Sequence, residues 1–109
     1  MANNIIEIAD FFKTLGDPTR LKLIRLLLSY NNLCVGMIAK KLKITQPAVS
    51  QHLRILKNKG IVEGKRMGYY VHYQVNNDIF EKFGLRLNKI IKETEKDCEL
   101  EERCKTSPI

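Results

Sequence analysis

The chain has 109 residues, enough for one domain with a modest hydrophobic core. Its hydrophobic fraction of 44% and charged fraction of 28% are those of an ordinary globular protein, and no apolar run approaches the ~18 residues that span a bilayer. These values exclude a large multidomain enzyme and a membrane span. Three cysteines without a recognisable signal sequence argue against a secreted disulfide scaffold, so we expect a cytoplasmic protein with reduced thiols.

The net charge of +7 is concentrated in one part of the chain. Residues 40–70 contain eight basic side chains and a single acidic one, Glu63, whereas basic and acidic residues cancel over the rest of the sequence. Such a block attracts polyanions, and nucleic acid is the commonest polyanion in the cytosol. On composition alone, a solvated charged surface is the alternative interpretation.

Two amphipathic helices are predicted in the first third of the chain. The first runs from Ile5 to Leu15 and ends at Gly16, and Asp17-Pro18 supplies the N-cap and first turn of the second. The apolar positions that define them are Ile5, Ile8, Ala9, Phe12 and Leu15 in the first helix, and Leu21, Ile24, Leu27 and Leu28 in the second.

Two further helices are predicted in the basic window, separated by a three-residue turn. The shorter one spans roughly Val35 to Leu42, and the longer one runs from about Gln46 to Lys59, with Thr45 as its N-cap and Gly60 after its end. In the longer helix we expect Val49, Leu53 and Leu56 to face inward and Gln46, Ser50, Gln51 and Arg54 to face outward.

A β-hairpin and a last helix complete the expected fold. The strands are Ile61 to Lys65 and Tyr69 to Val75, and Arg66-Met67-Gly68 forms a basic turn between them. The last helix runs from about Asp78 to Thr94 and is capped by Asn76 or Asn77, with an apolar seam of Phe80, Phe83, Leu87 and Ile90. The predicted fold class is therefore mainly α with a small β-hairpin wing: a winged helix-turn-helix.

The pattern as a whole is typical of a DNA-binding protein. The longer central helix fits the major groove, where outward Gln, Ser and Arg side chains bond base edges or phosphates. A helix-turn-helix signal is weak alone, but here the turn, the charge window and the hairpin coincide. A winged-helix module that binds other proteins is the rival class. An enzyme is not expected, because the sequence lacks a Gly-rich phosphate loop, a nucleophile with a base and a paired-carboxylate signature.

The order of motifs resembles the ArsR/SmtB family of small winged-helix regulators over about residues 5–92. The resemblance implies a homodimeric repressor that binds an imperfect palindrome in double-stranded DNA and, in many members, lets go when a metal ion binds. It is carried by Asp17-Pro18-Thr19-Arg20-Leu21, Leu33-Cys34-Val35-Gly36, Gln46-Pro47-Ala48-Val49-Ser50-Gln51-His52-Leu53, Arg54-Ile55-Leu56-Lys57, the wing Gly64-Lys65-Arg66-Met67-Gly68-Tyr69-Tyr70, and Tyr73.

The resemblance also assigns candidate DNA-binding residues. Two of them carry an open alternative: His52 contacts DNA or is a half-buried structural residue, and Arg20 contacts a phosphate or lies on the surface. His72 is interpreted as a surface or packed residue, and the hairpin tyrosines Tyr69, Tyr70 and Tyr73 as packing residues rather than base-stacking groups. Gln46, Ser50 and Gln51 are expected on bases or the sugar-phosphate, Arg54 and Lys57 on the backbone, and Lys65 and Arg66 at a flanking minor groove or phosphate.

The first and last helices are expected to form a homodimer, with an apolar surface that includes Ile5, Ile8 and Phe12. Dimerisation would place two recognition helices about 34 Å apart, the spacing of successive major grooves. We accordingly predict a DNA-binding and dimerisation domain over residues 1–94 and a charged, cysteine-containing tail over residues 95–109.

Metal sites known in the family are not reproduced in full. A Cys-Val-Cys pair at the start of the third helix is represented only by Cys34-Val35-Gly36, and the last helix lacks the histidine of a second, zinc-type site. The tail contains Cys98 and Cys104 among acidic residues. With Cys34 as a third and less favoured ligand, these thiols suit ions such as As(III), Cd(II) or Cu(I) as effectors, with no cofactor required. A thiol redox switch, or no cysteine function, are the alternatives.

Overall fold

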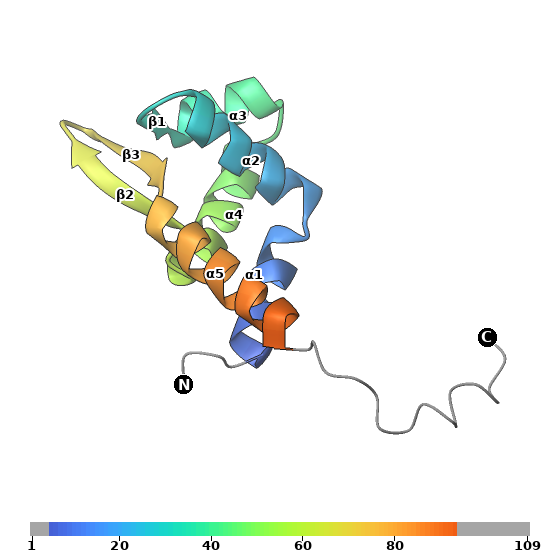
Figure 1. Ribbon diagram of the computed structural model, residues 1–109. Coiled ribbons are helices and arrows are strands. Elements are labelled where there is room, and N and C mark those ends of the chain that lie inside the picture. Colours follow the sequence, from blue (N-terminus) through green and yellow to red (C-terminus); the bar gives the residue numbers. More distant parts are fainter. Residues whose placement is uncertain (1–4, 94–109) are drawn as a thin grey trace, which may run out of the picture.

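The computed structural model describes residues 5–93, leaving residues 1–4 and 94–109 outside the described part. Over this range the chain forms helices that pack on one another and a three-stranded sheet whose hairpin projects from one side of them (Figure 1). None of the described helices is long and apolar enough to cross a membrane. In chain order the elements are α1 (Ile5–Leu15), α2 (Pro18–Ser29), β1 (Leu33–Cys34), α3 (Val35–Leu42), α4 (Gln46–Asn58), β2 (Val62–Met67), β3 (Tyr70–Val75) and α5 (Asn77–Glu93).

Side-chain caps fix where two of the helices begin. The Oδ2 atom of Asp17 accepts a hydrogen bond from the backbone N–H of Arg20 at 3.0 Å, and Thr45 Oγ1 accepts one from Ala48 at 3.2 Å. Each bond satisfies a backbone donor that a helix start otherwise leaves free. Both predicted N-caps are confirmed, as are the predicted bounds of α3, whereas α4 ends at Asn58, one residue before the predicted Lys59.

The hairpin is present, but its turn lies further along the chain than predicted. Strand pairing continues to Met67 opposite Tyr70, so the loop consists of Gly68 and Tyr69. Gly68 has a φ of +68°, as the first loop position of a two-residue type II′ turn requires. The predicted basic tip is therefore wrong: Lys65 and Arg66 lie within β2.

A third strand was not predicted. Leu33 and Cys34 form the two-residue strand β1, which pairs antiparallel with β3 and places Leu33 opposite Tyr73 and Cys34 opposite His72. The strand order is β1-β3-β2, so β3 occupies the centre of the sheet. Two residues are too few to show the alternation by which a strand is recognised in a sequence.

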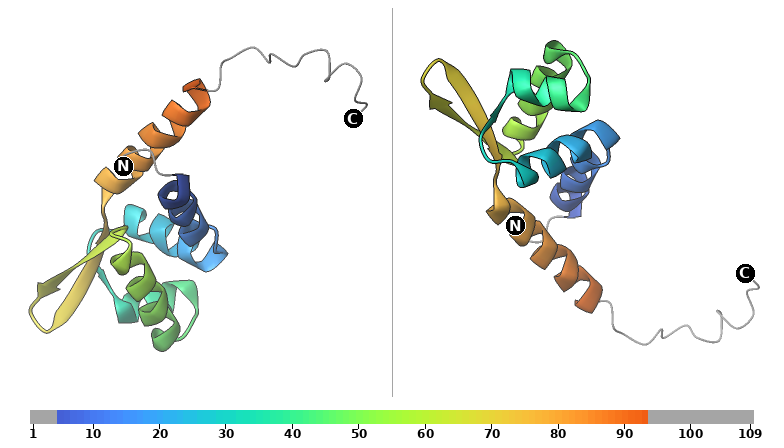
Figure 2. Two further views of the ribbon diagram at one scale, coloured as in Figure 1. Left: turned by 90° about the horizontal axis from the view of Figure 1, so that it is seen from below. Right: turned by 90° about the horizontal axis from the view of Figure 1, so that it is seen from above.

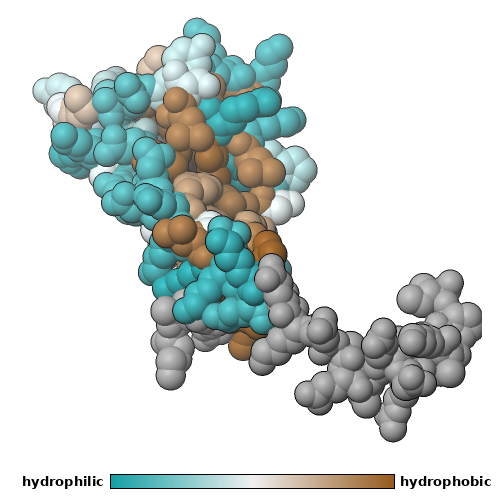
Figure 3. Space-filling view, in the orientation of Figure 1, coloured by the Kyte–Doolittle hydropathy of each residue, from teal (hydrophilic) through white to brown (hydrophobic). Residues whose placement is uncertain are grey.

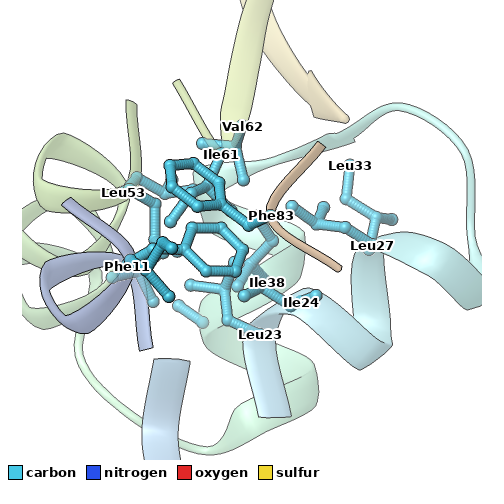
Figure 4. Close-up of a cluster of buried hydrophobic side chains, with 14 residues drawn as sticks. Phe11, Leu23, Ile24, Leu27, Leu33, Ile38, Leu53, Ile61, Val62 and Phe83 are labelled. Atoms are coloured by element: carbon cyan, nitrogen blue, oxygen red, sulfur yellow. The ribbon is translucent and has the colours of Figure 1, made fainter. Parts of the chain in front are cut away.

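The α1 helix contributes Phe11 to the core, a residue that was not among the apolar positions predicted for this helix. Phe11 is 5% exposed and Phe12 is 41% exposed. Ile8, which was predicted in the dimer surface, is 4% exposed and lies in the core, so that prediction is wrong for Ile8. The ring of Phe11 stacks on that of Phe83 from α5, with centroids 4.3 Å apart and an interplanar angle of 11°. Figure 4 shows these two rings side by side among aliphatic side chains from the other helices and the start of β2. Phe83 is the buried residue of α5, and Ile79, Phe80 and Ile90 of the same helix also pack against the core.

The buried face of α2 is also rotated from the predicted one. Leu23 is fully buried, together with Ile24 and Leu27, whereas Leu21 is 50% exposed and Leu28 is exposed as well. Figure 3 shows apolar residues on the surface over this helix. The run of leucines at positions 26–28 is compatible with either face, so only the packing of α2 against α1, α3 and β3 selects one.

A single residue, Asn76, joins the hairpin to α5. Its N–H donates to the carbonyl of Ile61 at 2.8 Å, and its Nδ2 donates to the carbonyl of Gly60 at 3.1 Å, immediately after α4. Its Oδ1 accepts from the N–H of Asp78 and so caps α5, as predicted. Figure 2 shows the hairpin and α5 leaving this joint in opposite directions. The predicted boundary between residues 94 and 95, and the tail after it, lie outside the described residues.

Two leucines on the same helix test this assignment of the core. We expect Leu23→Ala to lower the free energy of unfolding by about 2–5 kcal/mol, because it leaves a cavity in the core. Leu21→Ala removes the same atoms from an exposed position and should cost less than about 1 kcal/mol. Urea denaturation followed by circular dichroism measures both, and equal losses would contradict the observed orientation of α2.

Candidate nucleic-acid interface

The helix α4 presents a polar face to solvent because its other face is anchored in the core. Val49, Leu53 and Leu56 are buried, as predicted. They lie at positions i, i+4 and i+7, so the residues between them on the far side of the helix must point outward. The structure leaves Gln46, Ser50, Gln51, Arg54 and Lys57 exposed.

The turn before α4 is that of a helix-turn-helix. The preceding helix α3 ends at Leu42, and its C-cap residue Lys43 has a φ of +58° and donates its N–H to the carbonyl of Ala39. This left-handed residue stops α3 and allows the chain to reverse within three residues. Ile44 packs against the core and Thr45 starts α4, so α3 and α4 have a fixed relation.

Two hollows lie between α4 and the sheet. One, of about 240 Å³, is lined by Ser50, Leu53, Arg54, Lys57 and Tyr73. The second, of about 370 Å³, extends along the hairpin and is also bounded by Tyr73. Ser50, Arg54 and Lys57 bring a hydroxyl and two cations to the rim of the first hollow. This is the donor set that binds phosphate oxygens. The second hollow is further lined by Cys34, Val35, Gly36, Gln46, Tyr69, Tyr70 and Val71.

The strand register separates the two wing cations that were predicted to act together. Arg66 pairs with Val71 and Lys65 pairs with His72. Since side chains alternate between faces of a sheet, Arg66 shares the face of Val71 and Tyr73 that borders α4, while Lys65 lies on the opposite face. Tyr69 at the tip is 97% exposed and Tyr70 is 64% exposed, so the predicted packing role is wrong for these two tyrosines. Arg66 is thus the wing cation that the register places on the same side as Arg54.

Not every cation of the basic window contributes to this surface. Lys59 forms an ion pair with Asp10 of α1, with Nζ and Oδ2 2.7 Å apart. The Nζ of Lys41 lies over the ring of Tyr30, 4.3 Å from its centroid. These two side chains stabilise contacts between elements. The charge block predicted from the sequence is therefore divided between an exposed face on α4 and intramolecular pairs.

Arg20 and His52 face each other rather than the solvent. The guanidinium Nε of Arg20 donates to the carbonyl of Thr14 at 2.7 Å, and its Nη1 lies 3.5 Å from His52 Nδ1. These contacts engage Arg20 within the chain, and its two predicted roles, a phosphate contact or a surface residue, stay predictions. The half-buried alternative for His52 matches its position, with 22% of the side chain exposed.

Among residues 5–93, Cys34 is the one cysteine. Cys34 is a half-buried free thiol at the N-cap position of α3 and makes no side-chain capping bond there. Across the strand pair, the Nδ1 atom of His72 is buried without a hydrogen-bond partner. Between residues 5 and 93, no three His, Cys, Asp or Glu side chains are grouped so that they could hold a metal ion. Cys98 and Cys104 lie outside the described residues.

A helix-turn-helix followed by a hairpin, with a basic polar face on its second helix, defines the winged helix-turn-helix class of DNA-binding regulators. Comparison with known proteins gives the family. The model for "Bacterial regulatory protein, arsR family" matches residues 17–64. A relative described as an uncharacterized HTH-type transcriptional regulator, MJ1325 of Methanocaldococcus jannaschii, is 40% identical over 77% of this chain and 86% of its own length. The chain belongs to the ArsR family of transcriptional regulators.

Other members of the family show how far the similarity extends. The arsenical resistance operon repressor of Escherichia coli is 37% identical over 64% of this chain, and the match spans only 60% of that repressor. The homodimeric winged helix-turn-helix DNA-binding domain Mb0332 of Mycobacterium bovis has a similar structure, with a TM-score of 0.64 and 26% identity over 84% of each chain.

The exposed cations of α4 give a direct test. Arg54→Gln and Lys57→Gln each remove one positive charge, so each should reduce the slope of log affinity against log salt concentration by about one. The measurement is an anisotropy titration with a duplex that the protein selects from a random-sequence pool. Lys92→Gln, in the last turn of α5, is the matched control and should keep the wild-type slope. Unchanged slopes in both α4 variants would contradict this assignment.

Proposed function

We propose that the chain acts as a homodimeric repressor that binds a two-fold symmetric operator and is released by a thiophilic metal or metalloid ion. The observation that carries the DNA-binding part is the polar face of α4, on which Ser50, Arg54 and Lys57 stand exposed opposite a fully buried apolar face. A protein that binds another protein through the same fold has no need to gather cations there. The cytoplasm is the expected compartment.

In the proposed complex α4 lies in the major groove. Its 13 residues make a rod about 20 Å long, and a groove about 12 Å wide admits one helix. Gln46 and Gln51 have amide groups that pair with base edges, and Arg54 and Lys57 neutralise the flanking phosphates. The wing then reaches the neighbouring minor groove with Arg66, while Lys65 on the other face of β2 contributes through the longer-range field.

Dimerisation is proposed through α1 and α5. These helices contact each other within the chain and leave Ile5, Phe12, Leu85 and Leu87 exposed. Apolar side chains on two adjacent helices are what a second copy would cover. The Mycobacterium bovis domain is described as homodimeric, which supports a homodimer for this chain. A dimer also presents two copies of α4, and this arrangement matches a palindromic operator.

One substitution on α5 tests the dimer. Leu87→Glu places a carboxylate in the proposed interface and should raise the dimer dissociation constant by about 100-fold or more. Sedimentation equilibrium measures this constant, and Leu28→Glu, on the exposed face of α2, serves as the control. A Leu87→Glu protein that remains folded and fully dimeric would place the interface elsewhere.

The effector is proposed to bind through the cysteines, because thiolates select soft ions. Relatives named for arsenic and cadmium resistance, at 34–37% identity, support an ion of this kind. We expect Cys98 and Cys104 to be ligands of this ion, and Cys34 is the candidate for a third ligand. A thiol redox signal uses the same residues and is the alternative that the experiment below separates.

The effector hypothesis predicts an absorption band. Anaerobic titration of the reduced protein with As(III) or Cd(II) should give a stoichiometric ultraviolet band from sulfur-to-metal charge transfer, and the same titration should release the selected duplex. Cys98→Ser and Cys104→Ser should each abolish the band, and Cys34→Ser then decides the third ligand. If the ions produce neither a band nor release of DNA, the metal hypothesis is wrong, and release by an oxidant in their place would support the redox alternative.

A further inference from the structure

A polar junction connects the recognition helix α4 to the end of α1 and the start of α2. Its centre is Arg20, in the first turn of α2. The Nε of Arg20 donates to the carbonyl of Thr14 on α1 at 2.7 Å, and its Nη1 lies 3.5 Å from Nδ1 of His52 on α4. The Oδ2 of Asp17 accepts from the backbone N–H of Arg20 at 3.0 Å and lies 3.9 Å from the same Nδ1.

The α1 side of this junction is firmly held. Thr14 is a buried polar residue, 6% exposed, and its Oγ1 donates to the carbonyl of Asp10 at 2.9 Å. Its own carbonyl lies in the last turn of α1, where carbonyls have no partner within the helix. Arg20 supplies that partner, and Asp17 fixes its backbone at the same time. Contacts with α1 and α2 alone therefore fix the position of the guanidinium.

On the α4 side, His52 lies between a buried residue, Leu53, and an exposed one, Gln51. The ring nitrogen that faces the junction is Nδ1, which in a neutral imidazole can accept a hydrogen bond from Arg20. His52 thus contacts the fixed guanidinium from the flank of α4, where a contact resists rotation of the helix about its own axis. Side-chain ends lie about 6 Å from that axis, so a rotation of about 20° would shift them by about 2 Å. Such a shift exceeds the tolerance of a hydrogen bond to a base.

We propose that Arg20 is a positioning residue for DNA recognition, which acts through His52 to fix the rotation of α4. The inference rests on the proposed reading of DNA by α4. In this proposal Arg20 does not contact DNA, and His52 acts through its Nδ1 atom. A lysine cannot take the place of Arg20, because one ammonium group does not reproduce the planar fork that serves Thr14 and His52 together.

Substitutions at His52 separate positioning from direct DNA contact. His52→Asn keeps a polar atom near the place of Nδ1, whereas His52→Gln keeps one near the place of Nε2 and loses the Nδ1 position. Positioning predicts that His52→Gln weakens binding of the selected duplex by about tenfold and that His52→Asn weakens it by no more than about threefold. The reverse order would show that His52 contacts DNA through Nε2 and would overturn the inference.

Substitutions at Arg20 provide the second arm. Arg20→Lys and Arg20→Ala should each weaken binding of the selected duplex by about tenfold, with little change on a random duplex and no change in salt slope. Arg25→Ala, an exposed arginine on the same helix, is the control and should match wild type. A salt slope reduced by about one in Arg20→Ala, with equal losses on both duplexes, would make Arg20 a phosphate contact.

The thermal unfolding midpoint of each variant is measured alongside its binding, to show that the variant is folded. If Arg20→Ala fails to fold, Arg20→Lys and the two His52 variants still decide between the roles. Selection of a duplex by the wild-type protein, and the slopes of Arg54→Gln and Lys57→Gln, test the proposed function independently. Wild-type affinity in both Arg20 variants would therefore overturn the positioning role alone and leave the DNA-binding face intact.

Discussion

The burial of one face of α4 is the constraint on which the rest of the structure depends. Val49, Leu53 and Leu56 enter a core built from every helix of the described part. Because a helix is rigid, anchoring these side chains turns the opposite polar face to solvent. The other elements hold this helix in place: α3 leads into it through a left-handed turn, and α1 and α2 meet it at Arg20. The interface is thus a product of the core rather than of separate loops.

The local features of the fold could be predicted because they are written in neighbouring residues. Asp17-Pro18 and Thr45 mark helix starts by a capping mechanism that needs no tertiary information. The choices that depend on distant partners could not be predicted. Phe11 rather than Phe12 enters the core because Phe83 stacks on it, and the two-residue strand β1 exists only because β3 lies beside it. Leu23 rather than Leu21 is buried because of the way α2 packs against α1, α3 and β3.

In the candidate site, too, local features could be predicted from the sequence and contacts between distant residues could not. The outward face of α4 follows from helical spacing and was predicted with its residues, whereas the separation of Lys65 from Arg66 depends on a hairpin register that the turn sets two residues away. The pairing of Arg20 with His52 joins positions 32 residues apart, for which no local pattern exists. A polar residue in the first turn of a helix gives the same sequence signal whether it binds DNA or another helix.

The joint at Asn76 has a mechanical consequence. Its hydrogen bonds to Gly60 and Ile61 tie the end of α4, the base of the hairpin and the start of α5 to one point. A helix of 17 residues extends about 25 Å from that point, so α5 carries the surface proposed for dimerisation away from α4 and the hairpin. In the proposed dimer, α4 and the wing of each subunit would share one attachment to the helix that meets the partner. A change in how α5 meets the partner would then act on both proposed DNA-binding elements through that one attachment.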